Sequence, residues 1–147
     1  MAVQAGRILA LDLGARRIGL AVSDELGWTA QGLPTLLRRN TQTDLDSLAA
    51  VIRENNVGLV LVGNPLRMGG GESAGTLQAA RFAGQLKRRT GVEVRLWDER
   101  LTTREASRVL RSSGVSISKR AKAIDRLSAI LLLENYLEHE SAARKQP

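Results

Sequence analysis

Four acidic residues occupy positions at which carboxylates could act together on a substrate. Asp12 interrupts the apolar run 8–13. Asp98 and Glu99 follow an alternating, strand-like segment, and Asp125 lies within a Leu-rich helical pattern. A carboxylate in an apolar strand is costly to desolvate unless a metal ion, a cation or several hydrogen bonds compensate it. Carboxylate oxygens suit Mg²⁺ or Mn²⁺, and such ions activate water for phosphodiester hydrolysis. The pattern therefore predicts a divalent-metal phosphodiesterase site.

Two of these acids also have simpler interpretations. Asp12 could form a salt bridge with Arg16 or Arg17 at the end of its strand. Asp125 could be a first-turn residue stabilised by the helix dipole. Against this, small residues one turn away from Asp125 would let its helix approach a sheet closely. The apolar residues expected to form the core face of that helix are Ile124, Leu127, Ile130, Leu131 and Leu133.

Positive charge is concentrated beside the predicted acids. The chain has 22 Lys and Arg against 15 Asp and Glu, a net charge of +7, which suits a polyanionic partner. Residues 100–126 contain eight basic and two acidic residues, so this segment alone carries +6. A solvated helix face is the alternative, but such faces normally mix the two signs of charge. The residues predicted to contact nucleic-acid phosphates are Arg16, Arg17, Arg67, Arg100, Arg104, Arg108, Arg111, Lys119, Arg120 and Lys122.

Composition excludes several other chemistries. The chain has no cysteine, which rules out disulfides, thiolate catalysis and cysteine-ligated zinc. Its single histidine, His139, lies in a polar segment, so a histidine-based triad or a multi-histidine zinc site is not expected. The sequence has neither a long apolar run nor a signal-peptide core. We therefore expect a cytoplasmic protein without a membrane partner, formed by one domain over 1–147 whose residues 140–147 are a disordered tail.

The Gly-rich loop 63–75 has no P-loop ending, and could either approach a substrate closely or be a surface turn.

The strands and helices that must position these residues follow a regular order along the chain. This order predicts an α/β fold with a mixed five-stranded sheet, in which a three-strand antiparallel meander is joined by two parallel strands. Ligands gather beyond the carboxyl ends of parallel strands, so Asp12, this loop and the pair at 98–99 should share one edge. The expected strands are 7–13, 17–23, 28–37, 57–62 and 92–97, and the expected helices are 43–55, 74–89, 102–113 and 121–138.

Four sequence blocks in this order resemble the YqgF/RuvX family, bacterial proteins with an RNase H-like fold related to Holliday junction resolvases. The resemblance covers nearly the whole chain, and it implies that Asp12, Glu99 and Asp125 are the catalytic, metal-binding acids. Asp98 remains the alternative to Glu99, because neighbouring residues of a strand point to opposite faces. The chain departs from the family at 67–70, where Arg-Met-Gly-Gly replaces an Asn-Met-Asp-Gly-like run, so the role of this loop in substrate preference is open. The four blocks are Leu11–Asp24, Val62–Leu66, Asp98–Ala106 and Lys122–Leu137.

The resemblance implies a nuclease in the 5′-end maturation of pre-16S ribosomal RNA, with ribosomal particles as partners. A Holliday junction resolvase acting on four-way DNA is an alternative, and it requires a dimer to cut two strands symmetrically. A non-catalytic module that binds RNA or the ribosome is a second alternative. An actin-like ATPase shares the fold but duplicates it in a much longer chain, which a single copy of 147 residues disfavours. The sequence does not decide between monomer and homodimer, between endonuclease and exonuclease, or between one and two metal ions.

Overall fold

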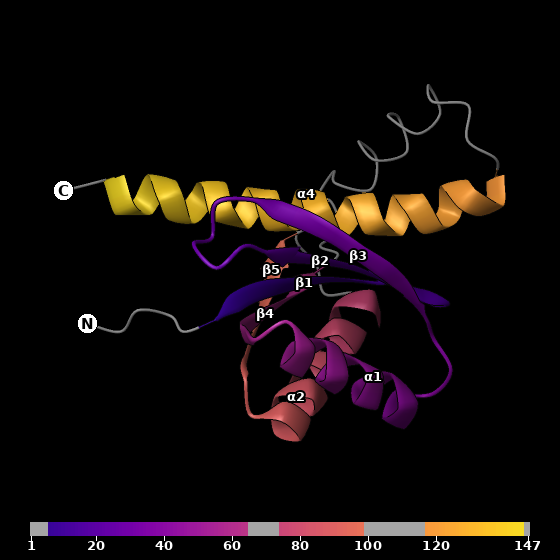
Figure 1. The fold of residues 1–147 in the computed structure, drawn as a ribbon. Helices are drawn as coiled ribbons and strands as arrows, with labels where there is room; N and C mark the ends of the chain where they lie inside the picture. Colours follow the sequence, from indigo (N-terminus) through magenta and orange to yellow (C-terminus); the bar gives the residue numbers. More distant parts are fainter. Residues whose placement is uncertain (1–5, 65–73, 99–116, 146–147) are drawn as a thin grey trace.

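A five-stranded sheet forms the centre of the computed structural model, which describes residues 6–64, 74–98 and 117–145 (Figure 1). The spatial order is β3-β2-β1-β4-β5, with β1–β2 and β2–β3 antiparallel and β1–β4 and β4–β5 parallel. This arrangement confirms the predicted mixed sheet, and it places β3 at one edge. The predicted helix 102–113 and most of the loop 63–75 lie outside the described residues. The strands are β1 Arg7–Leu13, β2 Arg17–Ser23, β3 Ala30–Leu37, β4 Val57–Asn64 and β5 Glu93–Asp98.

The described helices cover the two faces of the sheet. The helices α1 (Thr41–Glu54) and α2 (Ala74–Thr90) lie on one face, and α4 (Ile117–Lys145) crosses the other (Figure 1). The helix α4 is longer than the predicted 121–138, and the tail expected at 140–147 is helical as far as Lys145. None of the described helices is long and apolar enough to cross a membrane.

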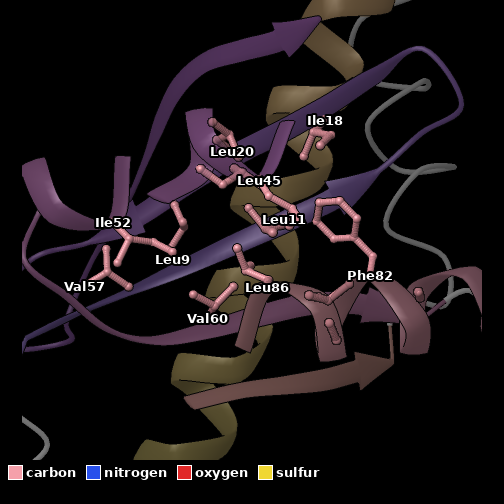
Figure 2. Close-up of a cluster of buried hydrophobic side chains, with 14 of the residues drawn as sticks. Leu9, Leu11, Ile18, Leu20, Leu45, Ile52, Val57, Val60, Phe82 and Leu86 are labelled. Atoms are coloured by element: carbon pink, nitrogen blue, oxygen red, sulfur yellow. The ribbon is translucent and has the colours of Figure 1, made fainter. Parts of the chain in front are cut away.

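Strand alternation divides the core into two layers. On β1, Leu9 and Leu11 belong to the cluster under α1 and α2, whereas Ile8 and Ala10 belong to the cluster under α4. Figure 2 shows the first cluster, in which Leu11 lies among side chains from both helices. Because helices cover both faces of β1, nearly every residue of this strand is apolar. Asp12 therefore stands out in the sequence as the residue that interrupts this run.

The helix α4 packs unusually close to the sheet, because small residues line the contact. Ser128 and Ala129 are 1% and 0% exposed, and the carbonyl oxygen of Asp125 lies so close to Gly19 that a Cβ there would overlap it. The core face of α4 differs from the prediction: Leu133 is buried, but Ile124, Leu127, Ile130 and Leu131 are only partly buried. The physical reason is that the small residues lie against the sheet, which turns part of the predicted leucine-rich face away from it.

A buried aspartate joins the start of α1 to the strand before it. The carboxylate of Asp44 accepts hydrogen bonds from the Arg38 Nε at 3.3 Å and from the Arg39 backbone N–H at 3.0 Å. Arg38 also donates through Nη1 to the carbonyl of Gly14 at 3.0 Å, and its guanidinium lies 5.6 Å from the ring centroid of Phe82. The segment between β3 and α1 is therefore tied to the turn that follows Asp12.

Asp44→Ala is expected to lower the free energy of unfolding by about 2 kcal/mol, because hydrogen bonds to a buried charged group are lost. Urea denaturation followed by circular dichroism measures this change. Asp46→Ala is the matched control: Asp46 is on the same helix, but its ion pair with Arg89 is exposed at both ends, so the loss should stay below about 1 kcal/mol. Equal losses for the two variants would contradict a structural role for the buried carboxylate.

Candidate nuclease site

Asp12 lies near the carboxyl end of β1 and is only 9% exposed. Its Cα partner on the neighbouring strand β2 is Gly19. Alternation from Ile8 and Ala10 puts Asp12 on the face of the sheet that α4 covers. The carboxylate is thus held between the sheet and α4, at the edge where the chain turns from β1 into β2.

The helix α4 brings Asp125 to the same place. The backbone of Asp125 contacts Gly19, the residue paired with Asp12 across the sheet. The Asp125 side chain is 18% exposed and is held by Arg17, whose Nε lies 2.7 Å from Oδ2. The structure therefore brings together two of the three predicted acids, although they are far apart in the sequence.

The sequence allowed two simpler interpretations: a salt bridge between Asp12 and a neighbouring arginine, and a first-turn position for Asp125. In the structure the Nε of Arg17 pairs with the carboxylate of Asp125. Asp125 lies in the third turn of α4, because that helix begins at Ile117, so the helix dipole at the first turn does not account for it. The Arg17 guanidinium gives the charge of the Asp125 carboxylate a paired cation at 2.7 Å.

The third predicted acid belongs to the end of β5. Register pairs Leu11 with Val62 and Asn64 with Asp98, so the carboxyl ends of β1, β4 and β5 meet at one edge of the sheet. The backbone of Asp98 is placed at this edge, whereas Glu99 lies outside the described residues. Contacts with α4 fix the end of β5, since the Trp97 Nε1 donates to the Asn135 Oδ1 at 3.0 Å.

The donor chemistry of this site suits a hard divalent cation. Within the described ranges no three Asp, Glu, His or Cys side chains form a group that could hold a metal ion. Asp12 and Asp125 are two of the three predicted acids, and the third, Glu99, lies outside the described residues. His139 contacts the ring of Trp97, at 5.2 Å between centroids, and so belongs to the packing of α4 on β5. Oxygen ligands without nitrogen or sulfur favour Mg²⁺ or Mn²⁺ over zinc.

The predicted phosphate-binding residues divide into four groups. Arg16 and Lys122 are exposed beside the site, one on the turn after β1 and the other on α4, whereas Arg17 is engaged by Asp125. Lys119 and Arg120 lie in the first turns of α4, where the structure describes their backbone. The remaining predicted residues lie outside the described ranges: Arg67, Arg100, Arg104, Arg108 and Arg111.

Two features near the site were not predicted from the sequence. The first is Gly19, which had a signal, because a glycine inside an apolar strand often marks close backbone approach. The second is a basic pocket on the opposite face of the sheet, lined in part by Arg38, Arg39 and Arg81. Arg38 and Arg39 are adjacent, but Arg81 comes from a separate segment, so the sequence alone did not show that they line one pocket.

Comparison with known proteins places the chain in a family. The family described as "RuvX: Holliday junction resolvase" matches residues 6–139. A protein of Koribacter versatilis named "Putative pre-16S rRNA nuclease" is 54% identical over 142 residues, covering 97% of this chain and 93% of the relative. A protein of Shouchella clausii with the same name is 42% identical over 137 residues, covering 92% of this chain and 96% of the relative.

Solved structures agree on the fold. The fowlpox virus resolvase in complex with Holliday junction DNA matches with a TM-score of 0.60 at 14% identity, covering 91% of this chain and 98% of the resolvase. RuvC of Thermus thermophilus in complex with its junction substrate matches with a TM-score of 0.57 at 16% identity, covering 94% and 95% of the two chains. These likenesses show the RNase H-like fold predicted from the sequence. The match of the family over residues 6–139 and the identity of these relatives establish that the chain belongs to the RuvX family.

Proposed function

We propose that this protein is a divalent-metal-dependent nuclease that acts in the 5′-end maturation of pre-16S ribosomal RNA. The observation that carries the proposal is the meeting of Asp12 and Asp125 across Gly19, at the carboxyl edge of the parallel strands. The names of the relatives, which are 42% and 54% identical over most of the chain, support the choice of substrate. Such maturation would take place in the cytoplasm on ribosomal precursor particles.

Asp12, Asp125 and Glu99 would hold Mg²⁺ or Mn²⁺. The alternation of β5 disfavours Asp98 as the third ligand, because Trp97 packs in the α4 cluster and the next residue of a strand points to the opposite face. The resemblance to the family therefore remains the support for Glu99. When bound, a divalent cation supplies an activated water and stabilises the charge on the leaving oxygen.

The side chains around the acids have separate tasks in this proposal. The ion pair with Arg17 restrains Asp125, and the burial of Asp12 restricts its rotamers. Arg16, on the turn after β1, and Lys122, on α4, are exposed and would bind phosphates of the substrate strand. Binding of this kind is independent of sequence, so the shape and the end of the RNA would determine where the chain is cut.

Cleavage of four-way DNA by a homodimer is the second candidate function. It is favoured by the description of the matched family as a Holliday junction resolvase and by the fold shared with two resolvases bound to junction DNA. Symmetric cleavage needs two sites related by a two-fold axis. The oligomeric state in solution therefore separates this candidate from an RNA-trimming enzyme that works as a monomer.

A cleavage panel tests the proposal. Purified protein is incubated with end-labelled 16S precursor RNA, unstructured single-stranded RNA, duplex DNA and four-way junctions, each with Mg²⁺, Mn²⁺ or EDTA. We expect metal-dependent cleavage of the precursor at its 5′ extension, and the label pattern distinguishes a single internal cut from a ladder of shortened products. Symmetric nicking of junctions without RNA cleavage would overturn the choice of substrate. Binding of RNA without cleavage under any condition would favour a non-catalytic module.

A further inference from the structure

A pocket of about 640 Å³ opens on the α1/α2 face of the sheet. Its walls come from the turn after β1, the segment between β3 and α1, and the middle of α2. Four of its lining residues are arginines, namely Arg16, Arg38, Arg39 and Arg81, and Asp44 is the only acidic residue in the described lining. The pocket is large enough for a nucleotide-sized group, since small-molecule sites span about 300–1,000 Å³.

The charge of this pocket is poorly balanced by the protein itself. The carboxylate of Asp44 is already bound by Arg38 and by the backbone N–H of Arg39. Arg16, Arg39 and Arg81 are exposed, and none of them forms an ion pair with a carboxylate within the described ranges. Cationic side chains gathered in a concave site attract a polyanion more strongly than cations spread over a convex surface do.

The rest of the lining favours a phosphate and a sugar over a stacked base. Phe82 is only 4% exposed, and Arg38 already lies over its ring, so the ring is not available as a stacking platform. The amide side chains of Gln78 and Gln85 line the same pocket and can donate hydrogen bonds to oxygen atoms. Guanidinium groups bind phosphate through two parallel hydrogen bonds, which suits the phosphodiester backbone.

The pocket is adjacent to the proposed active site but on the other side of the sheet. Leu13, Gly14 and Ala15, the residues that follow Asp12, line it. The carbonyl of Gly14 accepts a hydrogen bond from Arg38, so the pocket wall and the turn after Asp12 are physically linked. A nucleic-acid strand that crosses this edge would meet Asp12 and Asp125 on the α4 face and the arginines on the α1/α2 face.

We propose that this pocket binds a backbone phosphate of the nucleic-acid substrate, at a nucleotide remote from the bond that is cut. The inference rests on the proposed nuclease function, because it extends the path of the same substrate strand. Its consequence is a minimum substrate length: a strand must cross the edge of the sheet to occupy both places.

Binding measurements in a cleavage-deficient background test the pocket. Single-stranded precursor RNA is titrated with Asp12→Asn protein by fluorescence anisotropy over a range of salt concentrations. Arg39→Gln/Arg81→Gln should reduce the slope of log K against log salt by about 1.4, since each phosphate contact to a single strand contributes about 0.7. The same double substitution in the otherwise wild-type protein should slow cleavage of long substrates at subsaturating concentration. It should have no effect on oligonucleotides too short to reach the pocket.

Arg53→Gln/Arg88→Gln is the matched control. It removes the same net charge from exposed positions on α1 and α2 that do not line the pocket. Equal salt slopes and affinities for the two double variants would overturn the pocket proposal and leave the nuclease proposal standing. Cleavage that survives Asp12→Asn would instead overturn the nuclease site. If the double variant does not fold, as checked by circular dichroism, Arg39→Gln and Arg81→Gln are measured singly, each with an expected slope change of about 0.7.

Discussion

Replacing Asp12 by asparagine is expected to lower the rate of metal-dependent cleavage by at least about 100-fold, because even residues that only orient metal ligands contribute about 10–100-fold. The substitution keeps the size of a side chain that is 9% exposed, so the fold should be retained. The measurement is the cleavage rate of precursor RNA at saturating Mn²⁺, alongside the affinity for the same RNA. We expect the rate to fall while the affinity stays within a few-fold of wild type.

A readout independent of cleavage is the stabilisation of the protein by metal. A ligand present at 100 times its Kd stabilises the folded state by about 2.7 kcal/mol, so Mn²⁺ should raise the Tm of the wild-type protein. The same concentration of Mn²⁺ should leave the Tm of Asp12→Asn nearly unchanged. Asp46→Asn is the control, because that carboxylate is exposed on α1 and is paired with Arg89. Unchanged cleavage and unchanged metal stabilisation in Asp12→Asn would show that the site is assigned wrongly.

Gly19→Ala is expected to lower the free energy of unfolding by about 3 kcal/mol, at the upper end of the usual cost of overpacking. The reason is geometric: the added methyl group would overlap the backbone carbonyl of Asp125, and a backbone cannot rotate away as a side chain can. For a chain of this size the loss corresponds to a fall in Tm of about 10 °C. Thermal and urea denaturation followed by circular dichroism measure it.

The same substitution should also impair the site, because relief of the overlap moves α4 away from the sheet and takes Asp125 away from Asp12. We therefore expect Gly19→Ala to lose both cleavage and stabilisation by Mn²⁺. Gly84→Ala is the control: Gly84 lies in α2, and the nearest atom to an added Cβ is the flexible end of Arg88 at 3.5 Å. A helical glycine replaced by alanine in open space should stabilise the protein by about 0.5–1 kcal/mol. Wild-type stability and activity in Gly19→Ala would contradict the close contact between β2 and α4.

Local patterns determined most of the sheet. The bounds predicted for the first two strands agree with β1 and β2. The buried strand predicted at 57–62 begins where predicted and ends two residues later, at Asn64. The reason is that alternation and apolar runs reflect burial on each side of a strand, and both are written in consecutive residues. The third strand begins later than predicted, at Ala30, because the Asp24 side chain accepts backbone hydrogen bonds from Trp28 and Thr29 and keeps them in the turn. These hydrogen bonds hold the pKa of the Asp24 carboxyl below its usual value, chiefly through Thr29.

The candidate site was predicted less completely than the sheet. Asp12 was identifiable because a carboxylate at the end of a buried apolar strand is energetically unusual. Asp125 was the weaker prediction, since the rotation of a long amphipathic helix about its axis is not set by its own leucines. The contact with Gly19 and the small residues Ser128 and Ala129 fix that rotation. Glu99 lies outside the described residues, so its role stays a prediction.

By itself, the sequence determined which chemical groups are available: carboxylates and an excess of positive charge, with no cysteine. It also determined a mixed sheet whose parallel strands end at one edge. Only the tertiary structure decided which charges meet. It paired Arg17 with Asp125, and it gathered Arg16, Arg38, Arg39 and Arg81 around a pocket behind the site. The physical reason is that burial leaves a periodic signal along the chain, whereas contacts between charges from separated segments depend on how the elements pack.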